Sequence, residues 1–160
     1  MSPTIATLYI VFWVVAAGYG VGLVAHAGTL IEAAAPFAAV LIAALRITGP
    51  VVEHIGWAAF TGWLGMTYAH TGRPLEVAVF FAYVVLAAQG TFRAPWLLGV
   101  AWLAHVAWDF VPRDLPDAYA ALPRACALFD APIGIYLLVC AASGRWRALT
   151  PSVRSAAARA

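Results

Sequence analysis

Apolar residues are gathered into six stretches along the chain, and each stretch is bounded by charged residues, Pro or Gly. The stretches cover residues 4–25, 30–45, 51–69, 74–88, 94–111 and 125–142. A helix that crosses a lipid bilayer needs about 20 predominantly apolar residues. The pattern therefore predicts an all-α polytopic membrane protein, a bundle of about six short transmembrane helices. The second and fourth stretches are short enough for re-entrant segments.

The connections between these stretches are short and contain residues that interrupt helices, at 48–50, 71–74 and 90–93. Short connections place consecutive helices side by side and antiparallel. Residues 112–124 hold four charged residues and three Pro, and we expect them outside the membrane. We expect residues 1–143 to form the transmembrane bundle and residues 144–160 to form a basic, disordered cytoplasmic tail.

The arginines predict the orientation of the bundle. Cytoplasmic connections of membrane proteins carry an excess of Lys and Arg. If both termini are cytoplasmic, the inner side holds six Arg, at positions 46, 93, 145, 147, 154 and 159, and the outer side holds three, at 73, 113 and 124. We therefore expect a multi-pass protein of the cell membrane with both termini in the cytoplasm.

Composition agrees with a lipid environment and excludes several kinds of function. The chain is 64% hydrophobic and 10% charged, whereas soluble domains carry about 25% charged residues. It has no Lys, which excludes cofactors held as lysine Schiff bases, and a net charge of +2 gives no basic surface for nucleic acid. The two Cys are predicted about 21 Å apart on one helix, beyond the reach of a disulfide.

Ionisable residues inside the predicted spans are gathered in one layer. Such residues are costly in a bilayer, so each is a candidate for a functional site. Counted at about 1.5 Å per residue from the midpoint of each span, five of them lie about 3–9 Å toward the outer side. They are Glu32, Glu76, His105, Asp109 and Asp130. His26 and His70 are expected nearer the outer surface, whereas Glu53 and His54 are expected on the inner side, at the start of a helix.

Spacing predicts that polar residues on each of the last two helices share a face. His105 and Asp109 are four residues apart, so they lie on one side of their helix. Cys126 and Asp130 repeat this spacing on the last helix, where Pro132 is expected to produce a kink. Two helices thus each present a polar pair at a similar depth.

These residues define a candidate site. Its catalytic groups are predicted to be His105, Asp109, Asp130 and Glu76. The lining of its substrate pocket is predicted to be Trp102, Trp108, Tyr83 and Cys126. Trp102 lies three residues before His105, and Tyr83 lies seven residues after Glu76, so each shares a helical face with a catalytic group.

Other interpretations of the same residues stay open. Polar side chains often bridge membrane helices, which would make His105 and Asp109 structural. No cofactor is expected, but a His with two carboxylates also suits a divalent metal ion such as zinc or iron, with His105, Asp109 and Asp130 as its ligands. Glu32, near the start of its helix, also suits the role of a helix cap.

Three sequence segments together resemble a known family. They are Glu76 at the start of an aromatic helix, the segment WLAHVAWD at 102–109, and the segment CALFD at 126–130. This order resembles a family of small bacterial integral membrane proteins classed only as a domain of unknown function, whose members carry a Glu, a WLxHxxWD helix and a CxxxD helix. The resemblance covers about residues 75–139. It implies that Glu76, His105, Asp109, Cys126 and Asp130 belong to one unit, and it implies no activity.

The sequence favours a membrane-embedded enzyme that performs general acid–base chemistry on a lipid or isoprenoid by isomerisation, cyclisation or hydrolysis. Low-dielectric surroundings favour neutral carboxyl groups, so one of Asp109, Asp130 or Glu76 is expected to keep its proton and act as the acid. His105 is expected to act as the base. The expected partners are the lipid bilayer and a hydrophobic small-molecule substrate, and not nucleic acid.

One alternative is a proton- or cation-coupled membrane transporter, or a subunit of one, because chains of Asp, Glu and His also carry protons across bilayers. A second alternative is a structural membrane partner protein. An enzyme predicts a cavity next to His105, whereas a transporter predicts polar residues that continue inward to Glu53 and His54.

Overall fold

The computed structural model describes Tyr9 and residues 30–64, 73–112, 114, 117 and 120–146. This part of the chain forms five helices and no strand. The helices are α2 (Leu30–Arg46), α3 (Pro50–Trp63), α5 (Pro74–Phe92), α6 (Trp96–Asp109) and α7 (Leu122–Ala142). The all-helical prediction is confirmed for these residues. Apart from Tyr9, the first predicted span lies outside the described residues, as do His26, His70 and residues 147–160.

Helix boundaries follow local sequence signals closely, with one exception. Pro stands in the first turn of α3, α5 and α7, where its missing N–H costs no helical hydrogen bond. The connection predicted at residues 90–93 is wrong in part, because α5 continues through Gly90 to Phe92. Gly90 permits close packing instead of a turn: a Cβ atom there would lie 2.5 Å from Leu98 Cδ2. Helix α7 likewise continues through Pro132.

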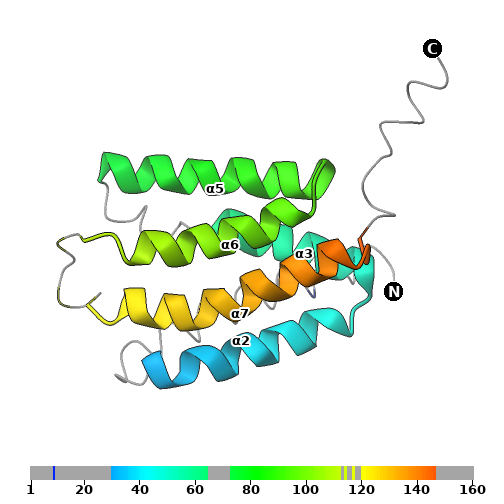
Figure 1. Cartoon of the computed structure of the whole chain (residues 1–160), viewed down its shortest axis with the longest axis horizontal. Coiled ribbons are helices and arrows are strands. Elements are labelled where there is room, and N and C mark those ends of the chain that lie inside the picture. Colours follow the sequence, from blue (N-terminus) through cyan, green and yellow to red (C-terminus); the bar gives the residue numbers. More distant parts are fainter. Residues whose placement is uncertain are drawn as a thin grey trace, which may run out of the picture.

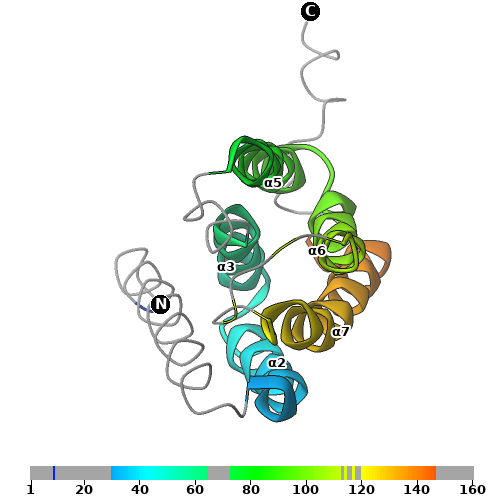
Figure 2. The same cartoon turned by 90° about the vertical axis from the view of Figure 1, so that its left-hand side faces the viewer.

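The helices form a ring that runs along one common axis. Figure 1 shows α2, α5, α6 and α7 extended side by side. Seen along the axis, the ring order is α2, α7, α6, α5 and α3 (Figure 2). Each helix contacts its two neighbours in the ring, and α3 also contacts α6 across it. Helix α7, the last of these helices in the sequence, therefore packs between α2 and α6, so the order around the ring differs from the order along the chain.

The ring has two chemically different ends. The first turns of α2, α5 and α7 and the last turn of α6 lie at one end, here called the His105 end (Figure 1). The last turns of α2, α5 and α7 and the first turns of α3 and α6 lie at the other, here called the Arg145 end. Helices α5 and α7 are both long and apolar enough to cross a membrane.

An aromatic core separates the two ends. Trp57 and Trp102 are fully buried and meet edge to face, with ring centroids 5.8 Å apart. The Trp102 indole N–H donates a 2.8 Å hydrogen bond to the hydroxyl oxygen of Thr61, and that hydroxyl donates to the Trp57 carbonyl at 2.8 Å. Trp102, which was predicted to line the substrate pocket, is therefore part of the core, because its only polar atom already forms a hydrogen bond with Thr61 there.

Glycine allows α6 and α7 to pack with their backbones close together. A Cβ atom at Gly99 would lie 2.7 Å from Leu138 Cγ and 2.8 Å from the Gly134 carbonyl oxygen. A Cβ atom at Gly134 would lie 2.8 Å from Leu103 Cγ. Small residues at helix contacts are the usual means of such packing in membrane proteins. Because these two helices supply the candidate site, the contact also sets its geometry.

Gly99→Ala is expected to destabilise the protein by about 1–3 kcal/mol, because the Gly134 backbone cannot move aside as a flexible side chain can. Unfolding in a denaturing detergent, followed by circular dichroism, measures the change. Gly62→Ala is the matched control, since a Cβ atom there meets only the Ala87 Cβ at 3.8 Å. Equal stability of the two variants would contradict the close approach of α6 and α7.

Candidate functional site

A buried hydrogen bond between α6 and α7 forms the centre of the candidate site. The His105 Nδ1 atom lies 2.6 Å from Asp130 Oδ2, and both side chains are 1% exposed. Asp109 follows His105 by one helical turn, and its Oδ2 lies 3.8 Å from the same Nδ1. Helical spacing on α6 and the close α6–α7 packing together bring these three groups to one point. With Asp130 ionised, the His105 Nδ1–H donates to it, which leaves the lone pair on Nε2.

Helix α5 covers a second side of His105. The ring of Tyr83 meets the imidazole edge on, with centroids 5.4 Å apart and an interplanar angle of 87°. Tyr83 is buried, and so is Glu76, two turns earlier on the same helix. Both side chains therefore face the interior of the bundle, on the helical face that their spacing predicts. The structure draws His105, Asp109, Asp130 and Tyr83 together, and it buries Glu76 in the first turn of α5 at the same end.

The remaining predicted residues lie elsewhere. Glu32 is exposed in the first turn of α2, so it is not buried with the other members of the predicted polar layer. A carboxylate at that position interacts well with the helix dipole, which accounts for it without a site. Trp108 is half-buried. Cys126 is also half-buried and packs against a small apolar group of Ala34, Leu122 and Ala125. Cys126 and Cys140 do not form a disulfide with each other.

Three ionisable side chains are buried close together at this site. His105, Asp109 and Asp130 each offer one ligand atom, and these three atoms lie within 4.8 Å of one another. Asp130 Oδ1 is buried and makes no hydrogen bond within the described part of the chain. Two carboxylates beside one imidazole are an arrangement that can hold a shared proton or a cation. The set of donor atoms is one that zinc or iron accepts.

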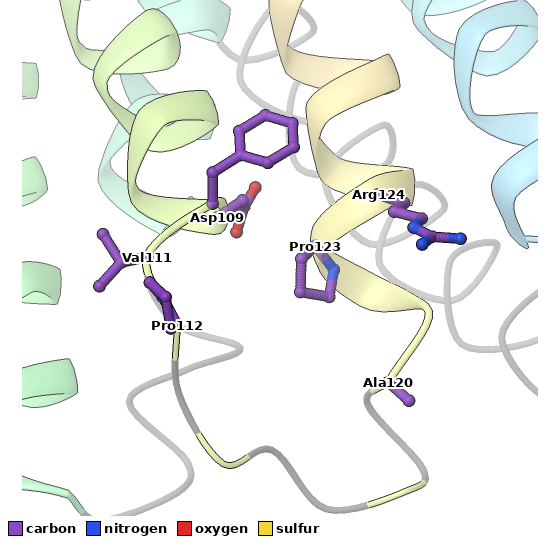
Figure 3. A pocket seen from close by; sticks show the side chains of 7 residues that line it. Asp109, Val111, Pro112, Ala120, Pro123 and Arg124 are labelled. Atoms are coloured by element: carbon purple, nitrogen blue, oxygen red, sulfur yellow. The ribbon is translucent and has the colours of Figure 1, made fainter.

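An open pocket lies at the surface of the His105 end, and its lining includes one residue of this cluster. Its volume is about 480 Å³, and it lies between the end of α6 and the start of α7 (Figure 3). It is lined by Asp109, Phe110, Val111, Pro112, Ala120, Pro123 and Arg124. Asp109 belongs both to the pocket lining and to the buried cluster, so it connects the two. The lining is mainly apolar, with one acidic and one basic side chain.

A second polar cluster occupies the Arg145 end, and sequence reasoning did not find it. Glu53 is fully buried there, and Arg145 Nε lies 2.5 Å from its Oε2. The Tyr136 hydroxyl donates to Glu53 Oε1 and accepts a 3.1 Å hydrogen bond from Arg46 Nη1. Arg145 Nη2 also donates to the Arg46 carbonyl at 3.3 Å. A lone Glu in an apolar stretch was the one signal in the sequence for a buried ion pair.

The start of the predicted tail is part of this cluster. Trp146 is fully buried, and its ring stacks on His54 with centroids 4.8 Å apart and 5° between the planes. His54 Nε2 lies 3.1 Å from the Gly90 carbonyl oxygen. Residues 144–146, which were predicted to belong to the tail, therefore pack against the bundle. Pairing with Glu53 and stacking on His54 hold this segment against the bundle.

Comparison with protein-family models, curated proteins and solved structures found no match to the chain. The resemblance of residues 75–139 to a family of unknown function stays a prediction. What the structure itself defines is a helical protein with a buried His and carboxylate cluster beneath an open pocket.

Proposed function

We propose that the chain is a multi-pass membrane protein with about six spans and both termini in the cytoplasm. Helices α5 and α7 support this directly, since both can cross a bilayer. They also expose large apolar side chains that water would disfavour. These are Leu75, Phe81, Val84, Val85 and Phe92 on α5, and Leu128, Ile135 and Val139 on α7. The protein is expected to stay in the membrane pellet after alkaline extraction, and its release would contradict the proposal.

The distribution of charge supports the orientation. Arg46, Arg93 and Arg145 belong to the Arg145 end, whereas Arg73 and Arg124 stand at the starts of α5 and α7, at the His105 end. Cytoplasmic connections carry the excess of Arg. The Arg145 end would therefore face the cytoplasm, and the pocket at the His105 end would open on the outer side of the membrane.

We propose that the His105 end is the active centre of a membrane-embedded enzyme that uses general acid–base chemistry. The observation that carries this proposal is the 2.6 Å hydrogen bond from His105 Nδ1 to Asp130 Oδ2, buried on both sides. A carboxylate in this position fixes the tautomer and the orientation of the imidazole, and it stabilises the ring once the ring has accepted a proton. A purely structural bridge between helices would not need the second carboxylate, Asp109, beside the same nitrogen.

The roles of the residues follow from this geometry. His105 Nε2 would take a proton from the substrate or from a water molecule, while Asp130 holds Nδ1. Asp109, at the junction of cluster and pocket, would hold the proton that returns to the substrate. The Tyr83 ring, packed edge on against His105, would keep the imidazole from rotating.

The pocket indicates the class of substrate. Phe110 and Val111 are exposed at its mouth, and Arg124 is exposed on its opposite side. An amphipathic molecule fits this combination, with its apolar chain toward the lipid and its polar head at the pocket. We therefore propose a lipid or an isoprenoid as the substrate, transformed by isomerisation, cyclisation or hydrolysis.

A proton- or cation-coupled transporter is the second candidate, favoured by the presence of polar clusters at both ends. The aromatic core argues against it, since Trp57, Trp102 and Phe60 are buried between the ends and the Trp102 indole donates its hydrogen bond to Thr61, which is not ionisable. A continuous chain of ionisable groups is what proton transfer across a bilayer requires. A structural partner role would require neither the pocket nor the clustered carboxylates.

The enzyme proposal is tested with purified protein in nanodiscs that contain a total lipid extract of the expression host. Mass spectrometry over time is expected to show one lipid or isoprenoid species falling while another rises. His105→Gln should abolish this conversion, whereas Glu32→Gln, which changes an exposed carboxylate, should retain it. An unchanged lipid profile with the wild-type protein, or equal conversion by His105→Gln, would contradict an enzymatic role.

A further inference from the structure

We infer that His105, Asp109 and Asp130 form a binding site for one divalent transition-metal ion, with zinc as the best-suited ion. The inference deepens the proposed function, on which its catalytic role rests, but with a metal ion bound His105 would serve as a ligand, and the ion would activate water in place of the imidazole. Metal binding itself can be tested without any substrate. The three ligand atoms lie within 4.8 Å of one another. Ligands that bind one zinc ion at about 2.0–2.2 Å lie roughly 3–4 Å apart, so small side-chain rotations are enough to enclose an ion.

The charges of the two ends of the bundle support this inference by contrast. At the Arg145 end, the buried Glu53 carboxylate is compensated by Arg145 at 2.5 Å and by the Tyr136 hydroxyl. At the His105 end, Asp130 is buried, its Oδ2 lies 2.6 Å from His105 Nδ1, and its Oδ1 makes no hydrogen bond among the described residues. A buried carboxylate oxygen without a partner is costly. A divalent cation beside the imidazole would give this oxygen a partner.

The donor atoms decide which cations fit. One imidazole nitrogen with two carboxylate oxygens suits zinc or ferrous iron, whereas magnesium and calcium prefer oxygen ligands alone. Three protein ligands leave a position for water or substrate, as in catalytic and not structural zinc sites. Asp109 lines the open pocket, so that position would be reached from the surface.

A metal ion at this point would narrow the proposed reaction. Bound zinc activates water and polarises carbonyl or phosphoryl oxygens. Hydrolysis is the member of the three proposed reactions that uses such an ion directly: one water molecule adds across an ester bond and yields an acid and an alcohol. The substrate class would then be a lipid ester, with its ester group at the pocket and its chains toward the membrane.

Titration of the detergent-solubilised full chain with zinc chloride, followed by calorimetry, tests the site. The wild-type protein, purified in metal-free buffer, is expected to bind one zinc ion per chain. Asp130→Asn and His105→Gln should each weaken binding by about 100-fold, at the upper end of the losses seen when only the partners of ligands are changed. Asp117→Asn is the matched control, because Asp117 is exposed and is not one of the three ligands.

Cobalt chloride gives a second measurement that does not depend on variants that fold poorly. Visible absorption bands of bound cobalt are expected with the wild-type protein and should vanish when excess zinc is added. Absence of saturable zinc binding by the wild type, or equal loss in Asp117→Asn, would overturn the metal site. Lipid conversion that persists in EDTA would overturn the role of the metal ion in the reaction but not the proposal that the protein is an enzyme. Zinc binding without lipid conversion would support the metal site and contradict the proposal that the protein is an enzyme.

Discussion

Arg145→Ala is expected to lower the free energy of unfolding by about 3–5 kcal/mol, the usual cost of removing one partner of a buried ion pair. Glu53 is fully buried, and Arg145 Nε lies 2.5 Å from its carboxylate. Without Arg145 the charge keeps the Tyr136 hydroxyl as a partner, but it loses the neighbouring positive group. Removal of the guanidinium also frees the segment that leads to Trp146. Detergent-induced unfolding followed by tryptophan fluorescence measures the change.

A matched set of variants separates charge from packing. Arg93→Ala removes an exposed Arg from the same end and is expected to cost little. Glu53→Gln should partly rescue Arg145→Ala, because the neutral amide removes the uncompensated buried charge. If Arg145→Ala were no less stable than Arg93→Ala, the buried ion pair would not stabilise the fold. If Glu53→Gln gave no rescue, the loss would come from packing alone.

Asp130→Asn is expected to reduce kcat for the proposed lipid conversion by about 10²–10⁴-fold, as expected when the residue that orients a general base is neutralised. The amide has nearly the volume of the carboxylate, but its NH₂ group faces His105 Nδ1 as a donor and favours the other tautomer. KM should change little, because Asp130 is buried and does not line the pocket. Initial rates over a range of lipid concentrations measure both constants.

Two controls keep this expectation specific. Asp117→Asn makes the same chemical change at an exposed position and should leave kcat unchanged. Circular dichroism and the thermal transition of Asp130→Asn should match the wild type closely enough to show an intact bundle. A rise in KM with an unchanged kcat would move Asp130 from the acid–base machinery to substrate binding. An unchanged kcat would show that the hydrogen bond from His105 to Asp130 does not contribute to the reaction.

The arrangement of the fold explains how one short chain holds two buried polar clusters. Gly99 and Gly134 bring α6 and α7 into close contact, which places His105 against Asp130. Helix α7 then continues to the other end, where Tyr136 donates to Glu53 and the residues after it fold back to complete the ion pair. The cluster at the Arg145 end therefore fixes the helix that supplies half of the candidate site.

Several features followed from the sequence alone. Apolar stretches bounded by Pro, Gly and charge gave the existence of α2, α3, α5, α6 and α7, because local composition and Pro at helix starts decide where helices form. Helical periodicity placed His105 and Asp109 on one face, since residues four apart always neighbour each other on a helix. The failures had causes that lie outside the segment concerned. Gly90 looked like a break, but it makes space for Leu98 on another helix.

The tertiary structure alone decided which side chains meet. Nothing in the spacing of residues distinguishes Asp130, which reaches His105, from Glu32, which is exposed, because depth along a helix does not determine which way the helix is turned. The pairing of Glu53 with Arg145 joins residues from opposite halves of the chain and depends on how α7 ends beside α3. Sequence periodicity fixes which residues share a helical face, whereas packing between helices sets the rotation of each face and hence the site.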